Sequence, residues 1–90
     1  MQENFGFGRA LELLREGKKV ARSGWNGTGM FIYLVPANTY EAQTDAARSF
    51  FVDGKVPYRS YLAIKTVAND VAPWSASGSD LLTEDWVEVQ

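Results

Sequence analysis

The sequence contains neither cysteine nor histidine, and each absence excludes a class of chemistry. Without cysteine there is no disulfide to stabilise a small fold, no thiol nucleophile and no thiolate ligand for zinc. Without histidine the chain lacks the side chain that most often serves as a general base near neutral pH. We therefore predict a protein that is not an enzyme, with no catalytic residues, no metal site and no cofactor.

Long apolar runs and concentrated positive charge are also missing. No apolar run approaches the roughly 20 residues of a membrane-spanning helix, and the first residues lack the basic and apolar regions of a secretory signal. The formal charge is -2, and lysine and arginine are spread along the chain rather than gathered in a stripe. We expect neither a membrane nor long nucleic acid as a partner, and a protein of the cytoplasm.

The residues that are present indicate one small ligand-binding domain over residues 1–90. Apolar residues make up 46% of the chain, which is typical of a folded protein rather than a disordered one. A chain of 90 residues buries a limited share of its surface, so association with further copies is the most available source of added stability. We expect a homo-oligomer.

Hydrophobic periodicity predicts the elements of the first half of the chain. Apolar residues at helical spacing predict an amphipathic helix over 7–16, which Gly17 should end. Apolar and β-branched residues predict strands over 20–22 and 30–35. These two strands should form a hairpin across the glycine-rich loop between them.

The second half of the chain is less regular. Only residues 49–52 resemble a strand between 37 and 56, and an imperfect alternation over 58–67 predicts one longer strand. A capping-box pattern predicts a short helix over about 78–82, and residues 85–89 alternate as a final strand. The predicted fold class is α+β, an N-terminal amphipathic helix packed on a small antiparallel sheet, with a short second helix near the C-terminus.

Two tryptophans lie in segments of small polar residues, which is the pattern of a binding site rather than of a strand. Trp25 follows Gly24 and precedes Asn26, and Trp74 precedes a run of serines. A nucleobase stacked on such a ring gains about 1–3 kcal/mol. The alternative is that each ring packs inward as part of the core. For Trp86, which lies in an alternating strand, the core is the better interpretation.

Polar residues near these tryptophans are candidates for the rest of a nucleotide. The N-terminus of the second helix could receive a pyrophosphate, with hydroxyls from Ser75 and Ser77. Asp80 is either the helix cap or an acceptor for ribose hydroxyls. Arg22 and Arg59 could offset ligand charge, although both also fit an ordinary solvated strand face.

The same residues carry a resemblance to a known family. The segments that match are Phe7-Gly8, Arg22, Gly24-Trp25-Asn26-Gly27, Gly29-Met30-Phe31, Pro73-Trp74, Ser77, Asp80-Leu81-Leu82 and Glu84-Asp85-Trp86. They resemble the second class of Thoeris anti-defence proteins, a small phage family. The resemblance implies homotetramers that sequester a cyclic ADP-ribose signal, uncleaved, in pockets shared between subunits, within the cytoplasm of the infected bacterial host.

By this resemblance, the pocket residues and its apolar walls can be named. The pocket would contain Trp25, Asn26, Trp74, Ser75, Ser77 and Asp80, and the walls would be Phe7 and Met30. The leading hypothesis is a phage protein that sequesters glycocyclic ADP-ribose and so prevents activation of the Thoeris effector. The alternatives are a module that blocks a host defence protein directly, a binder of other cyclic oligonucleotide signals and, less favoured, a cyclic-nucleotide hydrolase.

Overall fold

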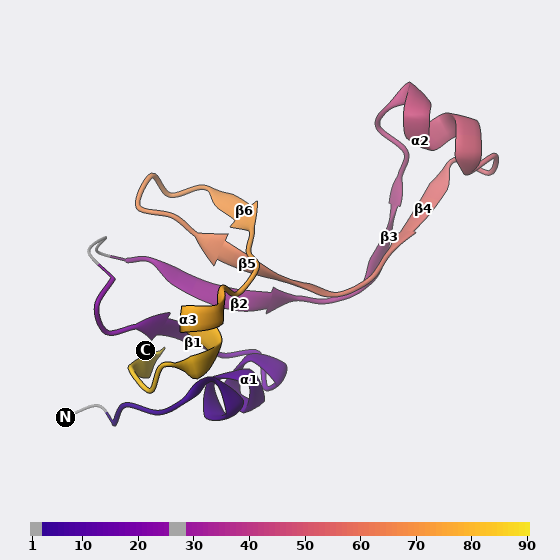
Figure 1. Ribbon diagram of the computed structural model, residues 1–90. Coiled ribbons are helices and arrows are strands. Elements are labelled where there is room, and N and C mark those ends of the chain that lie inside the picture. The colour runs from indigo at the N-terminus through magenta and orange to yellow at the C-terminus, as the bar shows by residue number, and fades with distance from the viewer. Residues whose placement is uncertain (1–2, 26–28) are drawn as a thin grey trace.

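A computed structural model of the chain describes residues 3–25 and 29–90. These residues form three helices and seven strands, and every strand pairing is antiparallel (Figure 1), so the predicted α+β class is confirmed. In chain order the elements are α1 (Phe7–Arg15), β1 (Lys19–Arg22), β2 (Phe31–Val35), β3 (Asn38–Glu41), α2 (Asp45–Phe50), β4 (Lys55–Tyr58), β5 (Tyr61–Lys65), β6 (Val71–Pro73), α3 (Gly78–Leu82) and β7 (Trp86–Val89).

The main part of the molecule, which we call the body, is a five-stranded sheet with α1 and α3. The strand order is β6-β5-β2-β1-β7, so the predicted hairpin of β1 and β2 lies inside the sheet. Both helices lie on the same side of this sheet, and α1 contacts β1, β2 and β7 (Figure 1). The core forms where they meet, from Ala10, Leu13, Leu14, Val20, Ile32 and Trp86.

Helix α1 follows its predicted course, with one difference in the buried face. Leu14 and Ala10 are fully buried as the helical spacing predicts, but Leu13 is buried as well, whereas Leu11 is only partly buried. The helix ends at Arg15, and Gly17 follows with a φ of +85°, a left-handed conformation that glycine adopts without steric cost. Because the chain reverses there, β1 can begin two residues later and return under the helix.

The segment before β5 differs from the prediction and forms an arm, residues 38–58. Strands β3 and β4 pair only with each other, and α2 connects them. The expected strand at 49–52 was wrong, because its first two residues end α2. That helix is capped by Thr44, whose hydroxyl accepts a hydrogen bond from the Ala47 N–H at 3.2 Å. This cap starts α2 ahead of the aromatic residues, so Phe50 lies inside the helix despite its β-propensity.

The expected single strand over 58–67 was also wrong, because it falls into two strands of different sheets. Tyr58 ends β4 in the arm, and β5 begins at Tyr61 in the body. Residues 59 and 60 lie between them, where the arm leaves the body (Figure 1). The molecule is therefore elongated, with extents of 51 × 26 × 25 Å.

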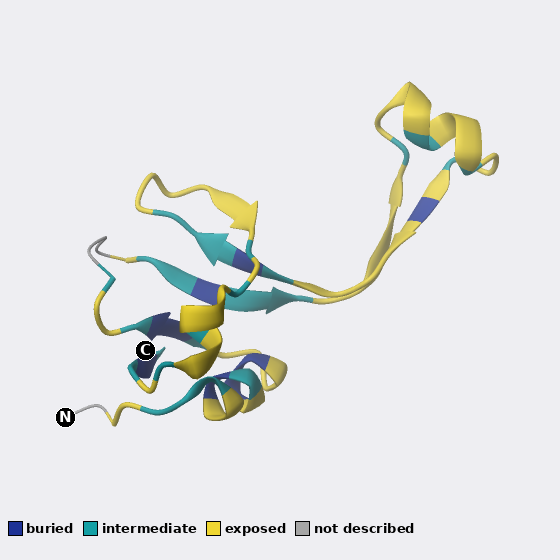
Figure 2. Cartoon of the chain, viewed as in Figure 1, coloured by how far each residue is buried: buried dark blue, intermediate teal, exposed yellow. Residues whose placement is uncertain are grey.

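Burial differs sharply between these two parts (Figure 2). Val56 is the only apolar residue of the arm that is counted as buried in the described chain. Phe50 and Val52, near the tip of the arm, are 78% and 92% exposed. The longest helix has nine residues, and no helix within the described ranges is long and apolar enough to span a membrane.

The C-terminal elements are as predicted. Ser77 and Asp80 form a reciprocal capping box at the start of α3, which spans the expected residues. Strand β7 then pairs with β1, and this pairing places Trp86 opposite Arg22. The chain thus brings the second tryptophan segment and the end of the first strand to the same part of the body.

Candidate ligand-binding site

An aromatic cluster forms around Trp86, which is fully buried as its position in an alternating strand predicts. Three rings contact it edge-on. Their ring centroids lie 5.4 Å (Phe7), 5.7 Å (Trp25) and 5.9 Å (Trp74) from the Trp86 indole. The Phe7 ring also lies 6.3 Å from that of Trp74. Edge-to-face contacts at these distances are favourable, so Trp86 holds the other three rings in fixed places.

Trp25 and Trp74 are partly buried and pack against the core from opposite ends of the sequence. The arrangement combines the two interpretations of these loops, since each indole is supported by the core but keeps part of its surface in solvent. Both rings contact Trp86, with ring centroids 5.7 Å (Trp25) and 5.9 Å (Trp74) from that of Trp86. Each indole therefore keeps part of its surface in solvent beside the same buried ring.

The backbone at each tryptophan is anchored by a hydrogen bond. The Trp25 N–H donates to the Arg22 carbonyl at 3.1 Å, which closes a turn directly after β1. The Trp74 N–H donates to the Leu62 carbonyl at 2.9 Å, which extends the ladder of β6 onto β5 by one residue. Each indole is thus mounted at the end of a strand of the rigid sheet.

Beside the aromatic cluster, Arg22 pairs with two carboxylates, and we call these three side chains the clamp. Its Nε and Nη2 donate to the two oxygens of Asp85 at 2.9 and 3.3 Å, and its Nη1 donates to Asp80 at 3.0 Å. The three side chains are 22% (Arg22), 31% (Asp85) and 14% (Asp80) exposed. These hydrogen bonds raise the pKa of Arg22, and the bond from Arg22 lowers the pKa of Asp85.

Both the carboxylate and the backbone carbonyl of Asp80 accept hydrogen bonds. Its carboxylate accepts from the Ser77 N–H at 2.8 Å, from the Ser77 hydroxyl at 2.9 Å and from Arg22, while its carbonyl accepts from the Trp86 indole N–H at 2.8 Å. Burial alone would raise the pKa of this carboxyl, but the hydrogen bonds from Ser77 and Arg22 hold it below its usual value. Of the two roles considered for Asp80, the structure displays that of helix cap.

The remaining candidate residues are Ser75, Ser77, Met30, Arg59 and Asn26. Ser75 is exposed, and the Ser77 hydroxyl lies 3.1 Å from that of Ser79. Met30 is partly buried, directly before β2. Arg59 is exposed at the base of the arm, and no ion pair with another described residue engages it. Asn26 lies outside the described residues.

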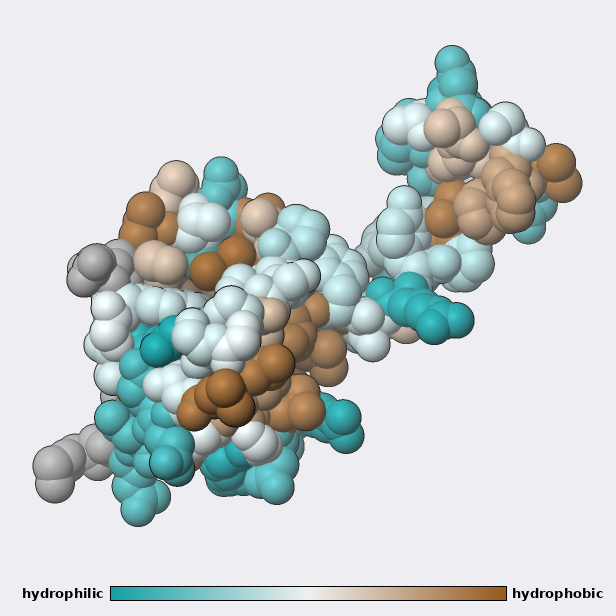
Figure 3. Space-filling view, viewed as in Figure 1, coloured by the Kyte–Doolittle hydropathy of each residue, from teal (hydrophilic) through white to brown (hydrophobic). Residues whose placement is uncertain are grey.

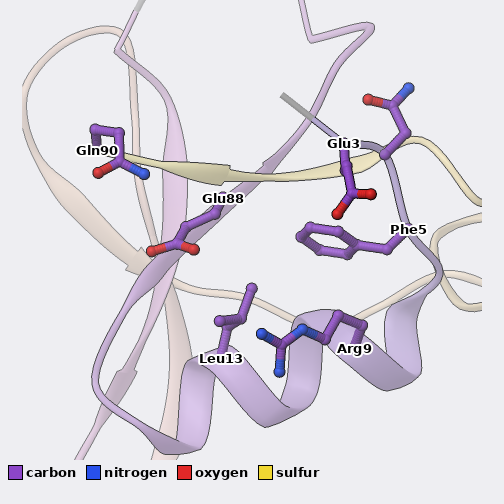
Figure 4. Close-up of a pocket in the computed structure, with 7 residues that line it drawn as sticks. Glu3, Phe5, Arg9, Leu13, Glu88 and Gln90 are labelled. Atoms are coloured by element: carbon purple, nitrogen blue, oxygen red, sulfur yellow. The ribbon is translucent and has the colours of Figure 1, made fainter. Parts of the chain in front are cut away.

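A cavity of about 450 Å³ lies elsewhere and was not anticipated (Figure 4). None of the candidate residues lines it; its walls are Glu3, Asn4, Phe5, Arg9, Leu13, Glu88 and Gln90. It forms because the N-terminal segment pairs with β7 through Phe5 and Trp86. The sequence signal for this pairing is weak, because so short an extended segment shows no alternation to detect.

Comparison with known proteins identifies the family. Residues 5–89 match the family model described as a Thoeris anti-defense 2-like domain. The chain belongs to this family. A relative named Thoeris anti-defense 2, from Bacillus phage SP01, is 35% identical over 86 residues, which cover 96% of each chain. The predicted resemblance is confirmed, and the Thoeris anti-defense 2-like match includes both tryptophan segments and the clamp.

Proposed function

We propose that this protein acts for a phage against Thoeris defence, inside the infected bacterial cell, by holding a cyclic nucleotide signal without degrading it. The family to which the chain belongs and the name of its phage relative support the anti-defence role. The proposed ligand is glycocyclic ADP-ribose. The observation that carries the ligand class is the pair of partly exposed indoles, Trp25 and Trp74, both supported by Trp86.

In this proposal the two indoles bind the adenine, since stacked rings bind any nucleobase by its flat face. Phe7 and Met30 add apolar contact beside them. Ser75 and Asn26 offer groups for the ribose hydroxyls. Arg59 is the cation of choice for the phosphates, because the charge of Arg22 is already offset by two carboxylates.

Capture rather than turnover is proposed because the chain contains no histidine or cysteine to act as base or nucleophile. A protein that only holds a signal must bind it more tightly than the effector does. A dissociation constant in the nanomolar range corresponds to about -12 kcal/mol. A supported stacking site is suited to this because its rings lose little freedom on binding.

The experiment is a capture-and-release assay with glycocyclic ADP-ribose. Protein is loaded with the nucleotide, freed of excess by desalting and denatured by heat, and the released molecule is identified by mass spectrometry. Intact nucleotide in a fixed ratio to protein is the expected result. Recovery of a hydrolysed product would overturn sequestration, and absence of any bound nucleotide would overturn the ligand class.

Matched variants assign the binding to the indoles. Trp25→Ala and Trp74→Ala should each weaken binding by roughly 5- to 150-fold, which corresponds to a stacking contribution of about 1–3 kcal/mol. Tyr40→Ala, at an exposed aromatic residue of the arm, is the control and should bind as the unmodified protein does. Circular dichroism in the far ultraviolet verifies that each variant is folded.

We also propose that the protein is a homo-oligomer, a tetramer, and that the arm carries contacts between subunits. The support is the exposure of Phe50 and Val52 on an element that the body does not cover. A two-stranded ribbon is marginal in water without a partner. Light scattering on the purified protein tests this. A monomer would refute the oligomer, and co-purification of a host defence protein on the arm would favour direct inhibition instead.

A further inference from the structure

Arg22 joins two segments that are far apart in the sequence and that carry the two indoles. Its partners Asp80 and Asp85 lie 58 and 63 residues further along the chain. On one side is the turn that follows β1 and presents Trp25. On the other is the segment that runs from Trp74 through α3 to β7 (Figure 1).

The clamp contacts the turn that carries Trp25 through backbone hydrogen bonds of Arg22 and Asp85 and through the side chain of Asp85. The Arg22 carbonyl accepts from the Trp25 N–H, and the next N–H, that of Ser23, donates to the Asp85 carbonyl at 2.8 Å. A Cβ placed on Gly24 would lie 3.9 Å from a carboxylate oxygen of Asp85, so that side chain lies directly against the turn. The geometry of the turn is therefore tied to the Arg22–Asp85 pair.

The clamp contacts the segment from Trp74 to β7 through Asp80. This residue receives Arg22 on its carboxylate and the Trp86 indole N–H on its carbonyl, and it closes the capping box that starts α3. Asp80 therefore links Arg22 both to the start of α3 and to the Trp86 indole. The Trp74 ring is part of the same assembly because it contacts Trp86.

We propose that Arg22 is a positioning residue, which fixes the spacing of Trp25 and Trp74 by joining their segments through Asp85 and Asp80, and which does not itself contact the ligand. The expected effect of Arg22 on ligand binding rests on the proposed function, whereas its expected effect on the geometry of the two indole rings does not. Three of the five N–H groups of the guanidinium already donate to carboxylates, and those two carboxylates offset its charge. A phosphate that approached the two remaining N–H groups would be repelled by the carboxylates of Asp80 and Asp85.

The role requires the planar fork of arginine rather than its charge. Two N–H groups reach Asp85 side by side while a third points to Asp80. A lysine ammonium carries the same charge but cannot form this planar pairing. Arg22→Lys therefore separates positioning from simple charge compensation, because it keeps the charge and removes the fork.

The first measurement reads the rings without any ligand. Coupled indoles give a circular dichroism signal in the near ultraviolet that depends on their mutual geometry. Arg22→Lys and Arg22→Gln should both reduce this signal while the far-ultraviolet spectrum keeps its shape, and Arg9→Gln, at an exposed ion pair of α1, should leave it unchanged. An unchanged near-ultraviolet spectrum in folded Arg22 variants would overturn the proposal, whatever the protein binds.

The second measurement is a double-mutant cycle of Arg22→Gln and Asp85→Asn, with glycocyclic ADP-ribose titrated by calorimetry. If Arg22 positions the site through Asp85, either single change weakens binding on the order of tenfold, and the double change costs little more. If Arg22 instead contacts the phosphates, Asp85→Asn frees it and preserves or improves binding. That outcome would overturn the proposal.

The two measurements keep the inference separate from the proposed function. Loss of the near-ultraviolet signal in a protein that binds no nucleotide would support Arg22 as the positioning residue and refute the ligand. Nucleotide capture with ring geometry unaffected by Arg22→Lys would support the ligand and refute the positioning role.

Discussion

The body and the arm use the same kinds of residue to opposite effect. In the body, aromatic rings converge on one buried indole, and helix, sheet and loops all contact it. In the arm, the ring centroids of Tyr40 and Tyr58 lie 5.6 Å apart across a two-stranded ribbon, yet both residues are about half exposed. Aromatic content alone therefore does not make a core, because the residues must also share an enclosed side.

The surface view makes the same contrast and adds one exception (Figure 3). Apolar residues are exposed at the tip of the arm and also on the body near α3. There Leu81 and Leu82 are 51% and 85% exposed, on the helix that the clamp attaches to the sheet. The body is thus well packed internally but keeps an apolar strip beside its candidate site.

The largest effect should come from Trp86→Ala. This change removes the ring that three others contact and leaves the Asp80 carbonyl without its indole donor, so we expect a loss of about 3–5 kcal/mol in unfolding free energy. Denaturation by urea, followed by far-ultraviolet circular dichroism, measures it. A loss below about 1 kcal/mol would show that the aromatic cluster does not organise the body.

The next comparison places one truncation in each region. Ile32→Ala in the body should cost about 2–5 kcal/mol, whereas Val56→Ala in the arm should cost about 1 kcal/mol or less, because no second apolar residue of the arm is buried with Val56. Hydrogen exchange gives the residue-level view, since amides of the arm should exchange through local opening and those of β1 and β2 only through global unfolding. Equal protection in the two regions would contradict the contrast.

A smaller effect concerns pH and belongs to the clamp. The folded-state pKa values of Asp80 and Asp85 are below their ordinary value of 3.8, so their stabilising contribution is complete above about pH 5 and is lost as the pH falls through the lowered values. The stability difference between the unmodified protein and Asp85→Asn should therefore shrink on acidification below pH 4. A difference that stays constant from pH 6 to pH 2.5 would contradict this reading.

The smallest effect on stability should come from Phe50→Ser combined with Val52→Ser. Both side chains are largely exposed, so the unfolding free energy of the body should change by less than about 0.5 kcal/mol. The apparent molar mass in light scattering should nevertheless fall if the arm joins subunits. Unchanged mass together with unchanged stability would place the subunit contacts elsewhere.

The sequence predicts the body well because its signals are local and agree with one another. The capping box of Ser77 and Asp80 and the helix stop at Gly17 are short patterns with a direct physical cause, and both are found where expected. The strands and the helix of the arm were missed because its apolar residues follow no period that a sheet or helix would bury. Residues 49–52 have β-propensity, but the local cap at Thr44 decides the structure.

The candidate site was predicted as a list of residues but not as an arrangement. Small-residue context identified Trp25 and Trp74, whereas their common contact with Trp86 depends on pairings between distant strands. Arg22 was identified as a cation near a loop, but its two carboxylate partners could not be assigned from spacing. Only the register of β1 with β7 brings them together.

The pairing of β1 with β7 also determines when the protein can fold. Lys19 of β1 pairs with Val89 of β7, so β1 gains this neighbouring strand only after β7 has been synthesised. Until Trp86 leaves the ribosome, α1 has no indole to cover, and the apolar side of the first hairpin remains wet. Folding of the body should therefore be a late event that requires β7, and fragments lacking β7 should be substrates for proteolysis.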